Sequence, residues 1–143
     1  GSPNLGVTID FAHSLYANEQ PALAASHILR RSQLLGLHLN DGYSKRDDGL
    51  MVGAVHALET MELLRECKQA GFGGAIYFDT FPDASGLDPV AECAANIRCV
   101  KRMLDAIDRL EQDNRLSDAQ SAQDAVVAVE IAQLALHGRS HPA

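Results

Sequence analysis

Three short apolar runs, each carrying a metal-ligand side chain at or near its end, constrain the possible folds of this chain most strongly. They span residues 6–13, 34–40 and 74–79. Each run has the length and the near-continuous apolar character of a buried parallel strand. The segments between them show helical periodicity over residues 21–32 and 55–69. Strands that alternate with helices predict a parallel sheet with right-handed crossover connections.

The rest of the chain predicts two further helices. Asp88-Pro89 is a helix-start signal, and the helical pattern after it continues to Gln112. Residues 117–120 read Ser-Asp-Ala-Gln, a capping box that would open a last helix ending at Leu136. The predicted order is therefore β-α-β-α-β-α-α. We expect the buried faces of these helices to include Leu23, Val90 and Ile97.

The number of strands limits the architecture. Three parallel strands are too few for a complete α/β domain, and a closed eight-stranded barrel needs about 250 residues. We therefore expect an α/β fold that forms the C-terminal part of a (β/α)8 TIM barrel. Residues 3–112 would be the last three βα units and residues 113–143 a C-terminal helix and tail, while Gly1-Ser2 has the form of a cloning scar. No Gly-rich phosphate-binding fingerprint follows a strand, which argues against a dinucleotide-binding sheet.

Composition excludes several classes of function. The net charge of -7 and the pI of about 5.2 leave no basic patch to neutralise phosphates, so we expect no nucleic-acid partner. No apolar stretch approaches the roughly 18 residues of a membrane span, and no signal-peptide pattern opens the chain. Cys67, Cys93 and Cys99 fall in helical segments and are odd in number. This usage predicts reduced thiols that pack between helices in a cytoplasmic protein.

The side chains at the predicted strand ends indicate a metal site. Asp10 and His13 end the first run, His38 lies near the end of the second with Asp47 and Asp48 in the loop beyond, and Asp79 ends the third. Taken singly, each has an ordinary explanation as a cap, a turn, or a surface or core histidine. Because parallel strands place ligand-binding groups at their carboxyl ends, we expect these residues to converge. Carboxylates with imidazole and no thiolate suit Mn²⁺, Mg²⁺, Co²⁺ or Zn²⁺.

Two details of this set stay open in the sequence. Asp10 and His13 would point to opposite faces of a regular strand, so they converge only if the strand ends near Phe11. Lys45 and Arg46 either contact substrate oxygens or balance the charge of the neighbouring aspartates. The remaining histidines lie in helical patterns or near the tail, and we interpret them as surface or packing residues. They are His27, His56, His137 and His141.

The strand-end motifs resemble those of the xylose-isomerase-like TIM barrels, and within them the sugar isomerases related to bacterial L-rhamnose isomerase. The matching segments are Ile9-Asp10-Phe11-Ala12-His13, His38-Leu39-Asn40-Asp41 with the following Asp47-Asp48, and Phe78-Asp79-Thr80. The resemblance covers residues 6 to about 110. It implies that Asp10, His38 and Asp79 hold a first metal ion, with Mn²⁺ preferred. It further implies that His13 and the Asp47-Asp48 loop hold a second, catalytic ion.

Two departures from the family pattern matter. The family often has Asp-x-Asp in the acidic loop, whereas this chain has Asp47-Asp48-Gly49. The fifth-strand glutamate ligand and a nearby catalytic lysine have no counterpart before Asp10, so we expect this chain to be the C-terminal part of a longer enzyme. The implied activity is aldose–ketose isomerisation of a small sugar, by hydride shift or through an enediol. The isolated chain is expected to be inactive.

Other functions are compatible with the same residues. Related barrels include sugar epimerases and inosose-type dehydratases, and a non-catalytic fragment that binds a partner chain is also an alternative. The expected partners are the sugar, the missing N-terminal part of the barrel and further copies of the chain as a homo-oligomer. We also expect self-association through unpaired sheet edges and an apolar inner sheet face. That inner face would carry Val7, Ile9, Leu37 or Leu39, and Ile76 or Phe78.

Overall fold

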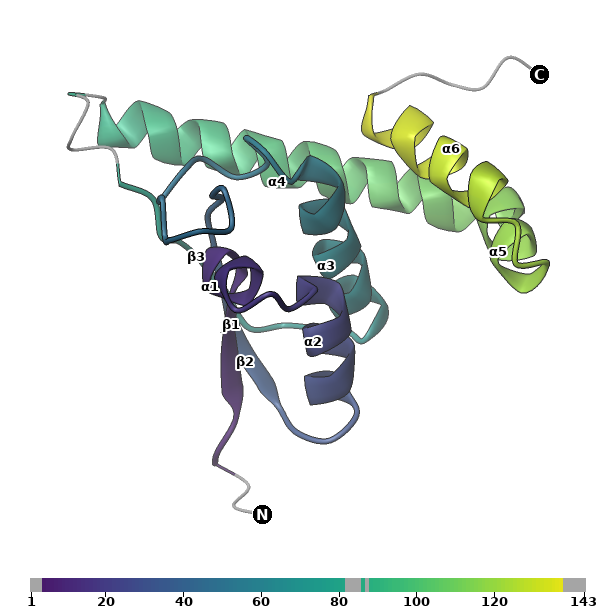
Figure 1. Cartoon of the computed structure of the whole chain (residues 1–143), viewed down its shortest axis with the longest axis horizontal. Coiled ribbons are helices and arrows are strands. Elements are labelled where there is room, and N and C mark those ends of the chain that lie inside the picture. The colour runs from purple at the N-terminus through teal and green to yellow at the C-terminus, as the bar shows by residue number, and fades with distance from the viewer. Residues whose placement is uncertain (1–3, 82–85, 87, 138–143) are drawn as a thin grey trace.

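The computed structural model describes residues 4–81, 86 and 88–137 and shows a mixed α/β fold with one parallel sheet (Figure 1). The sheet has the order β1-β2-β3, and both strand pairs are parallel. The predicted alternation of strands and helices is therefore confirmed. The elements are β1 (Val7–Asp10), α1 (Phe11–Tyr16), α2 (Pro21–Leu29), β2 (Leu34–Leu39), α3 (Ala57–Gln69), β3 (Ala75–Phe78), α4 (Pro89–Gln112), α5 (Asn114–Ser121) and α6 (Ala125–Leu136).

The two faces of the sheet have different surroundings. One face carries Ile9, Leu37 and Leu39, which are at most 5% exposed and belong to a core cluster shared with α2 and α3. The opposite face carries Thr8, Ala75 and Tyr77, all of them exposed to solvent. Tyr77 is 60% exposed. The described helices therefore bury only one face of the sheet.

This arrangement corrects the expected position of the apolar strand residues. Ile9, Leu37 and Leu39 do not lie on an uncovered inner face, because the helices bury them. Side chains alternate along a strand, so the face that presents Asp10 and His38 must carry their neighbours at a spacing of two, Thr8 and Gly36. The open face thus carries small or polar residues and Tyr77, and the helices bury Ile9, Leu37 and Leu39 on the other face. Val7 and Ile76, also expected on the inner face, are each 38% exposed.

Helices α4, α5 and α6 extend the molecule away from the sheet. Helix α4 crosses behind α3, and the α5–α6 hairpin lies at its far end (Figure 1). The Asp88 side chain accepts a hydrogen bond from the Val90 N–H and caps α4, as predicted. The helix also ends at Gln112 as predicted. Residues on the side of α4 toward α3 and α6 are buried, including Val100, Met103 and Ile107.

Several local predictions are wrong. Ser117 opens no helix, because Asp113 caps α5 four residues earlier and Asp124 caps α6. Leu23, Val90 and Ile97 are exposed by 57%, 75% and 42%. They lie where no described element covers their helix. Cys67 is buried, but Cys93 is exposed and packs against no core.

Two expected segments at the chain ends lie outside the described residues, and two helix boundaries differ from the predicted ones. The proposed scar at residues 1–2 and the tail from residue 138, with His141, belong to the part that the structure does not describe. Helix α2 ends at Leu29 rather than residue 32, and α3 begins at Ala57 rather than residue 55. Among the described residues, no helix is both long and apolar enough to cross a membrane.

Candidate metal centre

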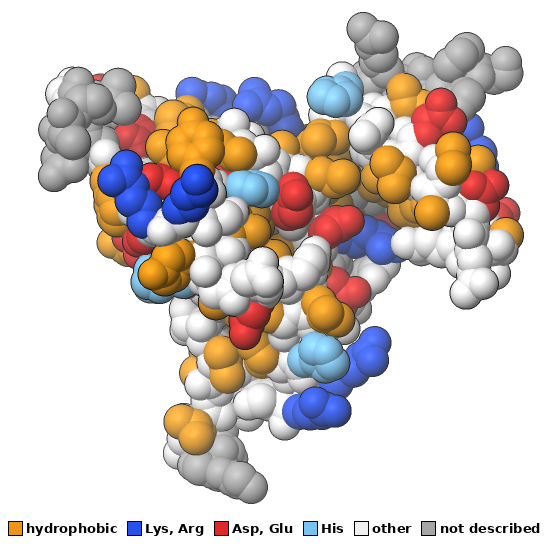
Figure 2. Space-filling model, viewed as in Figure 1, with side chains coloured by type: hydrophobic (Ala, Val, Ile, Leu, Met, Phe, Trp, Pro, Cys, Tyr) orange, Lys and Arg blue, Asp and Glu red, His pale blue; other side chains and the backbone are white. Residues whose placement is uncertain are grey.

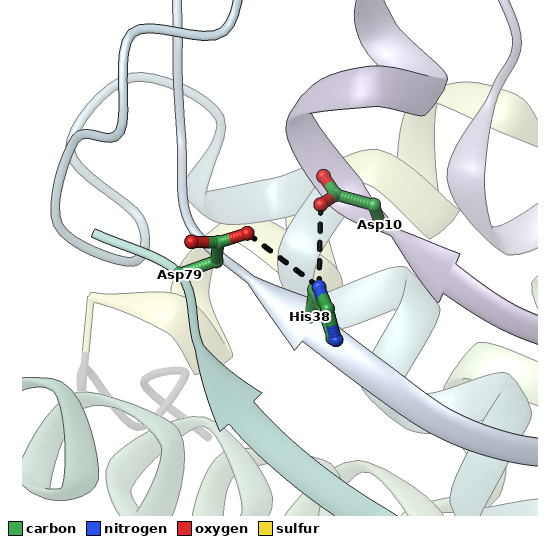
Figure 3. Close-up of side chains that lie close together, drawn as sticks. All are labelled: Asp10, His38 and Asp79. Atoms are coloured by element: carbon green, nitrogen blue, oxygen red, sulfur yellow. Dashed lines mark ion pairs between the residues drawn. The ribbon is translucent and has the colours of Figure 1, made fainter. Parts of the chain in front are cut away.

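The ends of the three strands bring Asp10, His38 and Asp79 together (Figure 3). Asp10 ends β1, His38 lies opposite it in β2, and Asp79 directly follows β3. One ligand atom from each of the three residues lies within 4.8 Å of the others. The predicted convergence of these three side chains is confirmed.

The His38 ring faces both carboxylates of this cluster at distances too long for direct hydrogen bonds. The His38 Nδ1 atom lies 3.6 Å from Asp10 Oδ2 and 3.5 Å from Asp79 Oδ2. Both distances exceed those of normal N–H···O hydrogen bonds. Two ligands at right angles, each about 2.1 Å from one ion, would themselves be about 3 Å apart. A shared divalent cation would require each of the two His38–carboxylate separations to shorten by about half an ångström.

The surroundings of His38 leave the cluster accessible and orient its ring. The side chains of Asp10, His38 and Asp79 are 19%, 40% and 34% exposed. The Tyr77 ring lies 5.1 Å from the His38 ring, centroid to centroid, on the same open face of the sheet. This contact limits rotation of the imidazole. A cation and a small polar molecule can therefore reach the cluster from solvent without displacing a helix.

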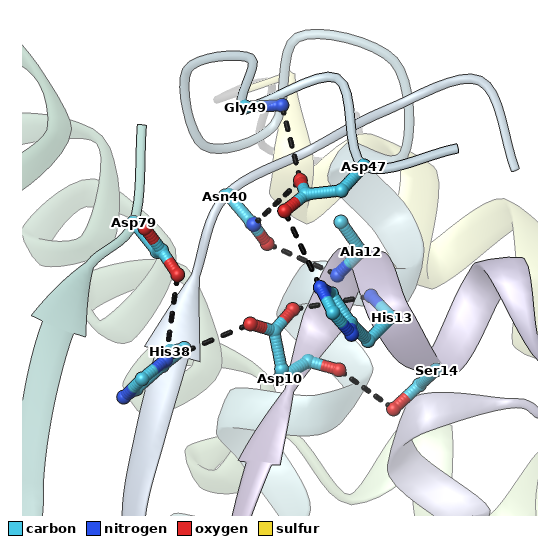
Figure 4. A network of polar contacts seen from close by, with 9 residues as sticks. All are labelled: Asp10, Ala12, His13, Ser14, His38, Asn40, Asp47, Gly49 and Asp79. Atoms are coloured by element: carbon cyan, nitrogen blue, oxygen red, sulfur yellow. Dashed lines mark hydrogen bonds and ion pairs between the residues drawn. The ribbon is translucent and has the colours of Figure 1, made fainter. Parts of the chain in front are cut away.

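Asp10 has a second contact that explains how strand and helix meet. Its Oδ1 atom accepts a hydrogen bond from the His13 N–H at 3.1 Å, and it is the N-cap of α1. The strand ends at Asp10, as convergence with His13 requires. One oxygen of the carboxylate thus caps the helix while the other faces His38 (Figure 4). Asp10 therefore acts as a helix cap through one oxygen, and its other oxygen stays directed at the cluster.

A second carboxylate–imidazole pair lies beside the first cluster. His13 Nε2 is 3.3 Å from Asp47 Oδ2, although the residues are 34 positions apart. The His13 side chain is 63% exposed, and that of Asp47 is 27% exposed. Among the residues that the structure describes, no third His, Cys, Asp or Glu completes a metal group with this pair.

Asn40 links the loop that carries Asp47 to the helix that carries His13. This role was not predicted. The residue is fully buried at the end of β2. Its Oδ1 accepts a hydrogen bond from the Ala12 N–H at 3.0 Å, and its Nδ2 donates to Asp47 Oδ1 at 3.4 Å. The Gly49 N–H also donates to Asp47, at 3.2 Å (Figure 4). The sequence signals were its place in the His38-Leu39-Asn40-Asp41 segment and its position two residues after His38, on the same side of the strand.

Asp48, the other candidate in the acidic loop, has different partners. Its Oδ2 accepts a hydrogen bond from the Tyr43 N–H at 2.8 Å, and its Oδ1 accepts one from Arg46 Nε at 2.7 Å. These two contacts, the backbone one first, hold the pKa of Asp48 below its usual value. Within the described part of the chain, Asp48 forms no contact with His13. The loop therefore presents Asp47 to His13, and Arg46 balances the charge of Asp48.

Asp41 stabilises the base of this loop. Its backbone pairs with that of Leu50 through two hydrogen bonds of 2.9 Å, which closes the loop that carries Asp47. Its fully buried carboxylate accepts hydrogen bonds from the N–H groups of Gly42, Val55 and His56, and it contacts the His56 Nδ1 atom at 2.8 Å. His56 is thus a packing residue, as predicted.

Comparison with known proteins adds no family to this geometry. No protein-family model matches the sequence, and no curated protein matches it. Function is therefore inferred from the arrangement of the residues themselves.

Proposed function

We propose that this chain supplies the last three βα units of a (β/α)8 barrel that catalyses the divalent-metal-dependent interconversion of an aldose and a ketose. The observation that carries the proposal is the Asp10–His38–Asp79 cluster, which lies at the carboxyl ends of three parallel strands. Barrel enzymes place their active sites at this end of the strands.

The open face of the sheet supports the barrel part of the proposal. In a closed barrel one sheet face lines the interior and the other packs against the surrounding helices. Here the helix-covered face is apolar, and the open face carries Thr8, Gly36 and the cluster. Within the described residues, β1 and β3 each pair on one side only. The remaining strands of the barrel would pair with these two edges.

The residue types present fit the proposed ions, and each residue would serve one of two ions. Asp10 Oδ2, His38 Nδ1 and Asp79 Oδ2 would hold the first ion, and a set of two carboxylates and one imidazole suits Mn²⁺. His13 and Asp47 would hold the second. A bound divalent ion polarises a carbonyl oxygen and lowers the pKa of a coordinated water.

The chain's own groups position this chemistry. Asn40 and the Gly49 N–H fix the Asp47 carboxylate, and the Asp10 cap fixes the first turn of α1 that carries His13. Because His13 is exposed on the open side, its imidazole can contact a sugar hydroxyl. Asp48 would support the loop rather than touch the sugar, since both its oxygens have partners in the loop.

The experiment follows interconversion of a panel of aldoses and ketoses with Mn²⁺ by the protein that contains the complete barrel. Turnover should fall by orders of magnitude in His38→Gln and in Asp79→Asn, and remain within about two-fold in His27→Gln, an exposed histidine of α2. The isolated 143-residue chain should be inactive, since a ligand misplaced by about 1 Å alone costs roughly 100-fold. Turnover that survives loss of His38 would refute the assignment.

The same open edges predict the association of the isolated chain. Unpaired strand edges pair with other chains unless they are covered, and the outer edges of β1 and β3 have no described partner strand. Sedimentation over a wide concentration range should therefore show species larger than the 15.4 kDa monomer. A clean monomer at every concentration would contradict the open-edge interpretation.

A further inference from the structure

A small cavity lies between α3 and the α5–α6 hairpin, far from the metal cluster. Its volume is about 150 Å³. Figure 2 shows hydrophobic side chains on both sides of the hollow between the main body and the hairpin. Lining residues come from four helices and are mostly apolar. Those that matter here are Leu58, Met61, Arg65, Leu116, Ala128 and Ala132.

Helical periodicity explains why the cavity forms. Leu58, Met61 and Arg65 recur along one face of α3, which points toward α6. On the opposite side, α6 presents Ala128 and Ala132, one turn apart. Two alanines facing large apolar residues leave the space between the helices incompletely filled. The cavity is thus built by the sequence of the two facing helices.

Arg65 is the unusual residue in this lining. Its Nε atom is buried and has no hydrogen-bond partner, and no ion pair to Arg65 occurs among the described residues. A buried donor without an acceptor is costly, more so when it belongs to a charged group. Glu62, an acid in the described lining, accepts a hydrogen bond from Gln20 Nε2 at 2.9 Å instead.

We propose that this cavity binds a small monocarboxylate with a short apolar tail, whose carboxylate pairs with Arg65 and whose tail fills the space beside Ala128 and Ala132. The guanidinium fork matches the geometry of a carboxylate. The cavity opens to solvent on one side, and its volume of about 150 Å³ is enough for an apolar group the size of benzene. Benzoate and hexanoate combine both features. This site is independent of the proposed isomerase activity and involves none of its residues.

The test titrates the isotope-labelled chain with benzoate and follows backbone amide signals by NMR. We expect saturable shifts in α3, α5 and α6, with a dissociation constant on the order of 1 mM for a ligand of this size. Benzyl alcohol, which has the same ring without the charge, serves as the neutral probe. Arg65→Met should weaken benzoate binding by about tenfold or more and change benzyl alcohol binding by less than about twofold.

Two further variants keep the outcome decisive. Ala132→Leu fills the cavity and should abolish binding of both probes. Arg98→Met, which changes an exposed arginine of α4, should affect neither. The proposal is overturned if benzoate produces no saturable shift in these helices, or if Arg65→Met binds benzoate as the original chain does. If Arg65→Met does not fold, unchanged benzoate binding by a folded Ala132→Leu variant overturns it equally.

Discussion

Two carboxylate–histidine sites lie a few residues apart in this chain and differ in how completely their polar atoms are satisfied. Around Asp41, the carboxylate is fully buried, and three N–H groups and the His56 ring surround it at 2.8 Å. Around His38, the carboxylates of Asp10 and Asp79 remain partly exposed at 3.5 to 3.6 Å. The first site has no position left for a ligand. In the second, one ligand atom from each of three side chains lies within 4.8 Å of the others.

The contrast shows that residue type alone does not identify a metal site. Asp and His occur in both, and His38 and Asp41 belong to the same strand-end segment. What separates the sites is the number of backbone N–H groups directed at each carboxylate. A carboxylate saturated with short hydrogen bonds stabilises the fold. A carboxylate left with free lone pairs beside an imidazole is available to a cation.

The largest expected effect is on the saturated site. Asp41→Ala leaves three backbone donors without an acceptor, so we expect the metal-free chain to lose about 3–5 kcal/mol of unfolding free energy. Asp79→Asn, in the unsaturated site, should change it by at most about 0.5 kcal/mol. Urea denaturation in the presence of a chelator measures both. Equal losses in the two variants would remove the distinction between the sites.

The next effect is on stabilisation by a metal ion, which should depend on the His38 cluster and not on the Asp41 site. Mn²⁺ at about 100 times its dissociation constant should stabilise the folded chain by about 2.7 kcal/mol, because it binds the folded state only. His38→Gln should abolish this gain and His27→Gln should keep it. Chelation should return the midpoint of unfolding to its metal-free value. Stabilisation that persists in His38→Gln would place the cation elsewhere.

The sequence contained enough information for the cluster but not for the saturated site. Asp10, His38 and Asp79 follow from one rule, since parallel strands end at a common edge and their terminal residues meet there. The role of Asp41 depends on a chain reversal that brings Leu50 and Val55 back to the strand end. No local pattern encodes that reversal.

The errors at the other elements have similar causes. The box at Ser117 satisfied the capping pattern, but Asp113 offers a carboxylate to the Arg115 N–H and starts the helix earlier. The open sheet face was assigned the wrong residues, although alternation from Asp10 and His38 determines it. Which face the helices cover depends on tertiary packing, and periodicity within one strand does not report it.

A smaller effect separates the two functions of Asp10. Asp10→Ala removes both the cap and the ligand, and loss of an N-cap costs about 1 kcal/mol. Asp10→Asn keeps an acceptor for the His13 N–H, and asparagine is an equally good N-cap, so the metal-free chain should be nearly unchanged. Both variants should lose the stabilisation by Mn²⁺. Urea denaturation with and without the ion distinguishes them. A large loss in metal-free Asp10→Asn would show that its charge stabilises the fold.

The smallest effect concerns Asp48, whose pKa is lowered first by the Tyr43 N–H and then by Arg46. A lowered pKa in the folded state means that the unfolded chain takes up the proton first as the pH falls. The contribution of Asp48 is therefore complete above its ordinary value of 3.8 and is lost as the pH falls through the lower folded value. Asp48→Asn should flatten the stability profile below about pH 4 and leave its slope near neutrality unchanged. Asp47 of the same loop contacts His13 and accepts a hydrogen bond from the Gly49 N–H. The NMR signal of Gly49 should therefore report whether the acidic loop opens in that pH range. A stability profile with the same acid slope in both proteins would show that Tyr43 and Arg46 do not hold this carboxylate in solution.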